Sequence, residues 1–273
     1  MQVSFLTVNF TIFYCMKINK KFKKAVKKIF ITFGVWNLIK GLLNKDKGAP
    51  LNKNLLEEGT KFYAQFIQKD DLVFDVGANY GNRVEIFQKL KASIVAVEPQ
   101  KKCVAYLSEK FPNIKIENIG LGSKNEIKTF YEADSSVLST FSSDYIEKVK
   151  DTRHKSSVWS KSIEIEIKTL EMLIEKYGEP KFIKVDVEGF ELEVFKGLKH
   201  KSGIISFEYN IPELQEEMVA CIRQLNEIGY QWFNFSKGET LIMGENWLTL
   251  NEFLLKLESR ELKMSNFGDI YAK

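Results

Sequence analysis

The chain has 273 residues, of which 44% are hydrophobic and 28% are charged, and its formal net charge is +4, as in many globular proteins. Its three cysteines and two histidines are too few and too scattered for a disulfide scaffold, a cysteine-rich zinc site or a multi-histidine metal centre, so these classes are excluded. The cysteine usage fits a reducing compartment, and we expect the protein to be cytoplasmic.

Residues 1–50 form a basic segment and a linker. Residues 1–47 carry ten lysines and one aspartate, a charge of +9, which leaves −5 for the rest of the chain. From Ile18 to Trp36 apolar residues recur every three or four positions, which predicts a basic amphipathic helix. Such a helix either binds an anionic membrane surface, through residues 17–43, or packs its apolar face on the rest of the protein. The sequence leaves both alternatives open.

The chain after this segment alternates strands and helices. Apolar runs over 71–76, 93–99 and 113–122 predict strands, and the amphipathic stretches 81–92 and 101–111 predict helices. Strands this apolar indicate a parallel sheet that is covered by helices on both faces. We therefore expect an α/β fold.

An insertion interrupts this alternation. The segments 126–133 and 162–170 alternate apolar and polar residues with period two, so we expect them to pair as an antiparallel β flap. The polar segment 134–161 between them is longer than an ordinary loop, which is typical of a functional or a disordered segment.

The α/β pattern resumes with a helix near 169–177. It continues through a strand, a helix, a strand and a helix over 181–189, 190–199, 203–210 and 211–229. The apolar runs 230–236 and 239–245 are expected to form a closing antiparallel pair. We assign 51–245 to one globular domain and leave 246–273 as a C-terminal tail without a predicted element.

The turn between the first predicted strand and helix, FDVGANYGN over 74–82, is a candidate ligand site. Gly77 and Gly81 allow the backbone to approach a ligand at the start of a helix. The turn lacks the GxxxxGK motif of a P-loop and the middle glycine of the GxGxxG motif, and Asp75 would repel a diphosphate. S-adenosylmethionine fits better, because its sulfonium and ammonium groups are cationic and it has no phosphate. The alternative is a plain strand-to-helix turn.

Further residues at strand ends complete the expected cofactor site. Asp75 is expected near the methionine end of S-adenosylmethionine. Glu98 follows Gly77 at the usual spacing of an acid that binds both ribose hydroxyls, and Asn118 is either an adenine contact or a turn cap. The predicted cofactor-binding residues are Asp75, Gly77, Ala78, Asn79, Gly81, Glu98 and Asn118.

Several motifs of the sequence resemble those of FkbM-type methyltransferases. They are VFDVGANYGN, VAVEP, NIGLG, KTLEMLI and FIKVDVEGFELEVFKGL, and the likeness covers about residues 60–210. Tyr80 departs from the pattern, which commonly has an aliphatic residue there. The resemblance implies a Rossmann-like class I methyltransferase fold, with a seven-stranded, mostly parallel sheet and a reversed last strand. It also implies S-adenosylmethionine as the cofactor and O-methylation of a sugar, a glycan precursor or a related metabolite.

Two carboxylates at the end of the strand over 181–189 are the candidate catalytic groups. Asp186 and Glu188 are two residues apart, so their side chains are expected to point to one side, toward the cofactor. One of them, with Glu208 at the end of the next strand, could act as the general base, or the group could hold a divalent cation that acidifies the acceptor hydroxyl. The alternative is that Asp186 and Glu188 cap the following helix. We predict Asp186, Glu188 and Glu208 as catalytic residues and assign no residue as a metal ligand.

The expected acceptor is a small molecule or a glycan. In the flap loop, Ser139 and Thr140 are candidate acceptor contacts, although a solvated serine-rich loop is the commoner explanation. No basic patch in the body suggests nucleic acid as a partner. Two other functions stay open: an NAD(P)-dependent Rossmann oxidoreductase, which the incomplete glycine motif disfavours, and a non-catalytic S-adenosylmethionine-binding module.

Overall fold

The structure is a computed structural model that describes residues 53–238, 240–257 and 267–273. The predicted amphipathic helix and the membrane contact through residues 17–43 lie outside the described residues. Among those that are described, no helix is long and apolar enough to cross a membrane.

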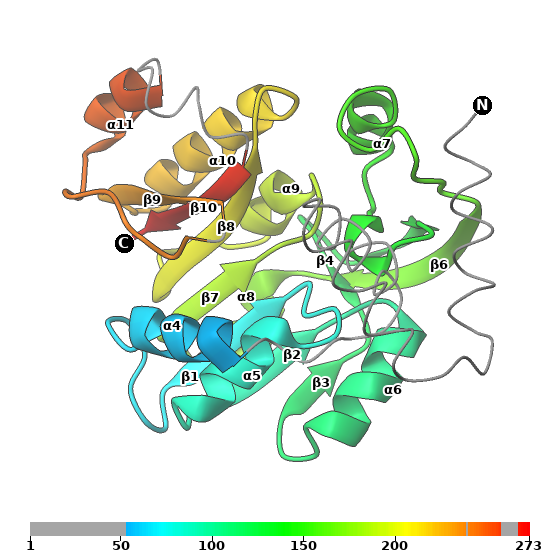
Figure 1. Cartoon of the computed structure of the whole chain (residues 1–273), viewed down its shortest axis with the longest axis horizontal. Coiled ribbons are helices and arrows are strands. Elements are labelled where there is room, and N and C mark those ends of the chain that lie inside the picture. The colour runs from blue at the N-terminus through cyan, green and yellow to red at the C-terminus, as the bar shows by residue number, and fades with distance from the viewer. Residues whose placement is uncertain (1–52, 239, 258–266) are drawn as a thin grey trace, which may run out of the picture. The chain divides into compact units, whose positions relative to one another are not determined.

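A seven-stranded sheet organises the protein (Figure 1). Its strands are β1 (Leu72–Val76), β2 (Ser93–Val97), β3 (Lys115–Glu117), β7 (Phe182–Val185), β8 (Ile204–Asn210), β9 (Phe233–Lys237) and β10 (Phe267–Ala272). They lie in the order β3-β2-β1-β7-β8-β10-β9, and the neighbours from β3 to β8 are parallel. Only β10 is reversed, since it is antiparallel to both β8 and β9 within this sheet of described strands. The predicted α/β fold with a mostly parallel seven-stranded sheet and a reversed last strand is confirmed.

A smaller sheet contains β4 (Gly120–Leu121), β5 (Glu126–Glu132) and β6 (Lys161–Lys168). β5 and β6 are antiparallel, which confirms the predicted flap. The run over 113–122, predicted as one strand, is instead divided between β3 in the large sheet and β4, which pairs with β6. Asn118 lies at the division, where its amide donates to the carbonyl oxygens of Glu98 and Pro99, both at 2.9 Å.

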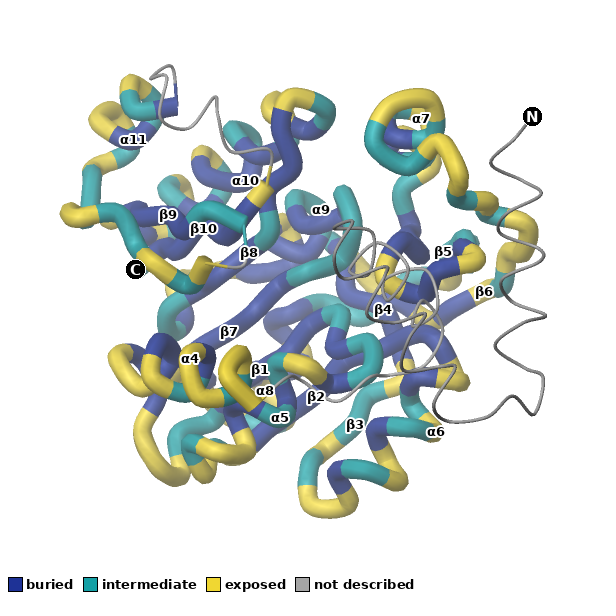
Figure 2. Tube along the Cα trace, in the orientation of Figure 1, coloured by how far each residue is buried: buried dark blue, intermediate teal, exposed yellow. Residues whose placement is uncertain are grey.

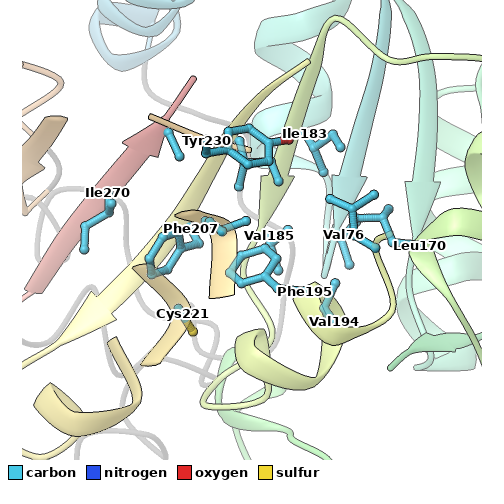
Figure 3. Close-up of a cluster of buried hydrophobic side chains, with 14 of the residues drawn as sticks. Val76, Leu170, Ile183, Val185, Val194, Phe195, Phe207, Cys221, Tyr230 and Ile270 are labelled. Atoms are coloured by element: carbon cyan, nitrogen blue, oxygen red, sulfur yellow. The ribbon is translucent and has the colours of Figure 1, made fainter. Parts of the chain in front are cut away.

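Helices cover both faces of the large sheet, as its apolar strands predict. One face packs against α4 (Lys53–Tyr63), α5 (Asn82–Lys89) and α6 (Lys101–Lys110), and the other against α8 (Leu170–Tyr177), α9 (Glu191–Lys196), α10 (Gln215–Glu227) and α11 (Leu250–Leu257). Successive strand residues alternate between the faces, so Val73 packs in the first core and Val76 in the second. Figure 3 shows side chains of the second core, among them Val76, Val185 and Phe195, and Figure 2 shows how deeply the central strands are buried.

The closing antiparallel pair forms between other segments than the sequence predicts. β9 pairs with β10, whereas the run over 239–245, predicted as the partner, contributes an isolated bridge to β9. β10 comes from the segment 246–273, for which the sequence predicts no element, and yet Ile270, Tyr271 and Ala272 are fully buried. The sequence of β10 predicts a strand only weakly, because glycine and aspartate, which are uncommon in strands, occupy two positions of FGDIYA.

Candidate active site

Acidic side chains gather at the carboxyl ends of the parallel strands. Asp75 lies in β1, Glu98 directly follows β2, Asp186 and Glu188 follow β7, and Glu208 lies in β8. Parallel strands place these ends at one edge of the sheet, where ligands bind in open α/β folds. The structure brings the three predicted catalytic residues together, because one carboxylate oxygen of each lies within 4.8 Å of the other two.

Both glycines of the turn after β1 are required by packing. Gly77 has φ of 85°, and a Cβ there would lie 1.8 Å from the carbonyl oxygen of Asp186. Gly81 has φ of 80°, and its Cβ would lie 2.6 Å from the ring of Phe111. The turn therefore approaches the end of β7 and the end of α6 so closely that only glycine fits. That Gly77 and Gly81 also contact a cofactor remains a prediction, which is separate from this structural role.

Asp75 is a buried carboxylate with one unsatisfied oxygen. Its side chain is only 2% exposed, and Oδ2 has no hydrogen-bond partner among the described residues. Burial raises the pKa of Asp75 to about 7, although Lys184 and Arg83 pull it down. A buried polar atom without a partner marks the place of a missing donor.

Glu98 is also buried, but both of its carboxylate oxygens are engaged. Oε2 accepts the backbone N–H of Asn79 and Oε1 that of Gln100, each at 2.8 Å. Burial nevertheless raises the pKa of Glu98 to about 7, against the effect of these two donors. The N–H groups of Gly77 and Ala78 both donate to the Val97 carbonyl. The turn after β1 therefore lies against the end of β2, where Glu98 is, and the N–H groups of Gly77 and Ala78 are already bonded within the protein.

Each of the three clustered carboxylates, which are the predicted catalytic groups, has its own protein partner. Lys184 Nζ lies 3.3 Å from Asp186 Oδ2, and Asn210 Nδ2 donates to Glu208 Oε2 at 2.9 Å. The Tyr145 hydroxyl donates to Glu188 Oε2 at 2.5 Å. These donors stabilise the three carboxylates, and three carboxylates at this spacing could also bind a cation.

The surroundings of the cluster raise the pKa values of its glutamates. Desolvation by the surrounding protein raises the pKa of Glu188 to about 8, and nearby Asp186 adds to this, whereas the hydrogen bond from Tyr145 opposes it. The pKa of Glu208 lies well above its ordinary value, because of burial first and then of Asp186 and Glu188. A carboxyl group that titrates near neutral pH is suited to taking up a proton during a reaction.

The structure does not support helix capping by the two acids. Among the described residues, the Asp186 carboxylate accepts from Lys184 and the Glu188 carboxylate accepts from Tyr145, and neither accepts from the N–H groups that begin α9. Glu191, which looks like a surface residue in the sequence, is instead buried and accepts the backbone N–H of Val187 at 3.0 Å. Asp186 and Glu188 are therefore free of that structural role and remain the predicted catalytic residues.

Lys184 is a buried cation that the sequence analysis missed. Its side chain is 1% exposed, and Nζ lies 3.0 Å from Asp269 Oδ1 in β10. Burial alone would lower the pKa of Lys184, but Asp186 and Asp269 outweigh it and hold the pKa well above its ordinary value. The feature of the sequence that indicates a buried Lys184 is its position inside the apolar run FIKVDV, between residues that point into the core.

The segment between β5 and β6 folds over the acidic edge. It contains a short 3-10 turn, η1 (Ser136–Leu138), and the helix α7 (Ser143–Val149). Ser139 and Thr140, the predicted acceptor contacts, are both buried, so they do not belong to a solvated loop. Thr140 Oγ1 donates to the Glu188 carbonyl at 2.7 Å, and Ser139 Oγ donates to Gln100 Oε1 at 3.4 Å. Contact of either residue with an acceptor stays a prediction.

Two further residues of this segment reach the site, and neither was predicted. Tyr145 of α7 donates to Glu188, as described above. Its side chain also packs so closely on Gly189 that a Cβ at Gly189 would lie 2.9 Å from Tyr145. Arg153 donates to Asn210 Oδ1 at 2.8 Å, which leaves the amide nitrogen of Asn210 to face Glu208. No local pattern in the sequence reveals these contacts, because their partners are about 40 to 60 residues away.

Comparison with known proteins identifies a family. The model of the family described as "Methyltransferase FkbM domain" matches residues 75–232, a stretch that contains every predicted site residue. No curated protein matches the chain.

Solved structures with a similar arrangement include three methyltransferases. A precorrin-6y C5,15-methyltransferase from Geobacter metallireducens has 11% identity and a TM-score of 0.39, over 82% of this chain and 92% of that one. A TehB-like S-adenosylmethionine-dependent methyltransferase from Corynebacterium glutamicum has 8% identity and a TM-score of 0.43, over 79% and 86%. Fibrillarin from Aeropyrum pernix, solved with natively bound S-adenosylmethionine, has 9% identity and a TM-score of 0.40, over 76% and 67%.

Proposed function

Since the chain belongs to the FkbM methyltransferase family, and is thus an S-adenosylmethionine-dependent methyltransferase, we propose that it methylates a hydroxyl group of a sugar, a glycan precursor or a related metabolite. The observation that carries the proposal is the edge of the sheet where Asp75 and Glu98 lie beside the cluster of Asp186, Glu188 and Glu208. It offers a place for a cationic cofactor next to carboxylates that can take a proton from an acceptor.

The residues present fit S-adenosylmethionine. Asp75 Oδ2 is buried without a donor, and the ammonium of the cofactor carries three N–H groups that could supply one. The site is rich in buried carboxylates, so a ligand with two positive charges gains where a diphosphate would be repelled. Glu98 is the acid at the end of β2 that would receive the ribose.

The protein has few chemical tasks in the proposed methyl transfer. When it is bound, S-adenosylmethionine supplies a methyl group already activated by the sulfonium, so the chain has to orient the acceptor, exclude water and accept a proton. We assign the proton to Glu188, because burial raises the pKa of its carboxyl to about 8 and it lies within the cluster of three carboxylates. Lys184 holds Asp186, and Asn210 holds Glu208, so these two carboxylates are fixed in position to orient the acceptor hydroxyl. The same acids disfavour a phosphate-rich acceptor such as nucleic acid.

Calorimetric titration tests the cofactor assignment. We expect S-adenosylmethionine to bind the full chain and NADH not to bind. Asp75→Asn removes a charge-assisted hydrogen bond to the ammonium, so the affinity should fall about 10- to 100-fold. Asp70→Asn is the matched control, because Asp70 lies just before β1, is exposed, and contacts Lys69 at the surface through its carboxylate. Binding of NADH, or equal affinities in the wild type and Asp75→Asn, would contradict the proposal.

The affinity for S-adenosylmethionine should depend on pH. The pKa of Asp75 and that of Glu98 are raised to about 7, so these carboxyl groups are ionised above pH 7 and protonated below it. The cationic ligand binds the ionised forms, so each carboxyl group that has to lose a proton weakens binding as the pH falls. For each such group, the affinity should fall by up to about tenfold per pH unit below pH 7. Titrations at pH 6, 7 and 8 measure the slope, which should become shallower in Asp75→Asn. A constant affinity over this range would show that neither carboxylate is in contact with the cationic ligand.

A further inference from the structure

Four residues form a closed ring of hydrogen bonds around the carboxylate of Glu98. Asn79 and Gln100 donate their backbone N–H groups to the two oxygens of Glu98. The side chains of the same two residues hold Ser136 of η1: Ser136 Oγ donates to Asn79 Oδ1 at 3.1 Å, and Gln100 Nε2 donates to the Ser136 carbonyl at 3.0 Å. Every residue that contacts the Glu98 carboxylate in this ring is therefore tied to the flap segment.

The ring covers the Glu98 carboxylate, which is the group assigned to the ribose. Glu98 and Gln100 are each 2% exposed and Ser136 is 3% exposed, so solvent does not reach the carboxylate. Asn118 also contacts this turn, since its amide donates to the carbonyl oxygens of Glu98 and Pro99. A ligand that uses Glu98 can enter only if one of these covers moves.

The 3-10 turn is the cover that belongs to the flap segment. Leu138 of this turn and Ser139 after it are also held, since Trp159 Nε1 donates to the Leu138 carbonyl at 2.7 Å and Ser139 Oγ donates to Gln100 Oε1 at 3.4 Å. Asp134 and Thr140, at the two ends of this stretch, are fixed by backbone bonds, the first to Val158 and the second to Tyr131. Between these fixed points, Ser136 is held to Asn79 and Gln100 by neutral hydrogen bonds, and the neighbouring Val137 is exposed. Neutral hydrogen bonds are weaker than charge-assisted ones, and short 3-10 turns are common at hinges.

We propose that Ser136 is a positioning residue of the cofactor site, which acts on Glu98 through Asn79 and Gln100 and has to release both before the adenosine half of S-adenosylmethionine can enter. The proposal rests on the proposed function, because it concerns the entry of that cofactor. The turn closes again over the bound ligand, so the ring exists in the free and in the bound protein but not during entry.

Rapid-mixing kinetics with S-adenosylmethionine itself tests this role. Ser136→Ala removes one hydrogen bond from both closed states, so association and dissociation should each become about fivefold faster while Kd changes by less than about twofold, the size of effect that one neutral hydrogen bond produces. Gln100→Met keeps the backbone N–H on Glu98 but removes the side-chain contacts to Ser136 and Ser139, so it should accelerate both rates at least as much. Val137→Ala is the matched control on the same turn, and its rates should equal those of the wild type.

The outcomes separate this inference from the proposed function. If the wild type does not bind S-adenosylmethionine, the proposed function fails and the inference fails with it. If the wild type binds but Ser136→Ala associates no faster, only the inference is overturned. An unchanged association rate with faster dissociation would make Ser136 a direct contact of the bound ligand, and would also overturn it.

Discussion

Lys184→Met is expected to lower the free energy of unfolding by about 3–5 kcal/mol, because it removes the cation from a buried cluster and leaves its carboxylates behind. Lys184 Nζ lies 3.0 Å from Asp269 and 3.3 Å from Asp186, and its side chain is almost completely buried. Methionine fills a similar volume, so the loss reflects the charge and not a cavity. For a domain whose total stability is about 5–15 kcal/mol, this is a large fraction.

Urea denaturation of both proteins measures the difference. Lys181→Met is the matched control, since Lys181 precedes the same strand but is exposed, and it should change stability by no more than about 0.5 kcal/mol. If Lys184→Met does not accumulate as folded protein, Asp269→Asn, which removes one partner of the lysine, should show a smaller loss in the same direction. Equal stability of the wild type and Lys184→Met would mean that the two aspartates do not depend on the lysine.

Glu188→Gln should reduce the rate of methyl transfer by a factor of about 10² to 10⁴, the usual contribution of a general base. Glutamine has nearly the same shape and can still accept the hydrogen bond from Tyr145, so the loss reflects the missing proton acceptor. The affinity for S-adenosylmethionine should stay close to that of the wild type, since the cofactor is assigned to Asp75 and Glu98. The measurement follows a radiolabelled methyl group from S-adenosylmethionine to a panel of methyl glycosides.

A neighbouring acid supplies the control for this variant. Glu191 is also buried, its pKa is raised to about 7 by burial, and it accepts the backbone N–H of Val187. Glu191→Gln keeps that hydrogen bond and should cost much less activity than Glu188→Gln. Similar losses in the two variants would show that the cluster as a whole, and not Glu188, is sensitive to charge. Transfer to none of the glycosides would count against the proposed acceptor class.

The parts of the fold that could be predicted from sequence are those with a local signal. The strands β1, β2 and β7 are mostly apolar runs with an acid at or directly after their end, so the positions of Asp75, Glu98 and Asp186 at one edge of the sheet followed from the strands alone. The period of two in the segments around β5 and β6 likewise predicted their antiparallel pairing. In both cases the residues that carry the pattern also carry the contacts.

The parts that could not be predicted depend on distant partners. Asp269 meets Lys184 only because β10 lies beside β8, and nothing near Asp269 in the sequence announces that strand. Tyr145 reaches Glu188 because α7 docks over the sheet edge, where its residues Tyr145 and Val149 pack against Leu214. Such contacts depend on tertiary packing, which a single sequence does not encode in any local period.

The position of β10 has a consequence for how the protein is made. In the sheet, β10 lies between β8 and β9, although it follows both along the chain. During synthesis, which proceeds from the N-terminus, β8 therefore has to wait with one open edge until residues 267–272 have left the ribosome. An open strand edge can pair with another chain, so this interval is the time at which a nascent copy is most exposed to aggregation. Arrival of the strand covers the edge and brings the carboxylate of Asp269 to Lys184 in the same step.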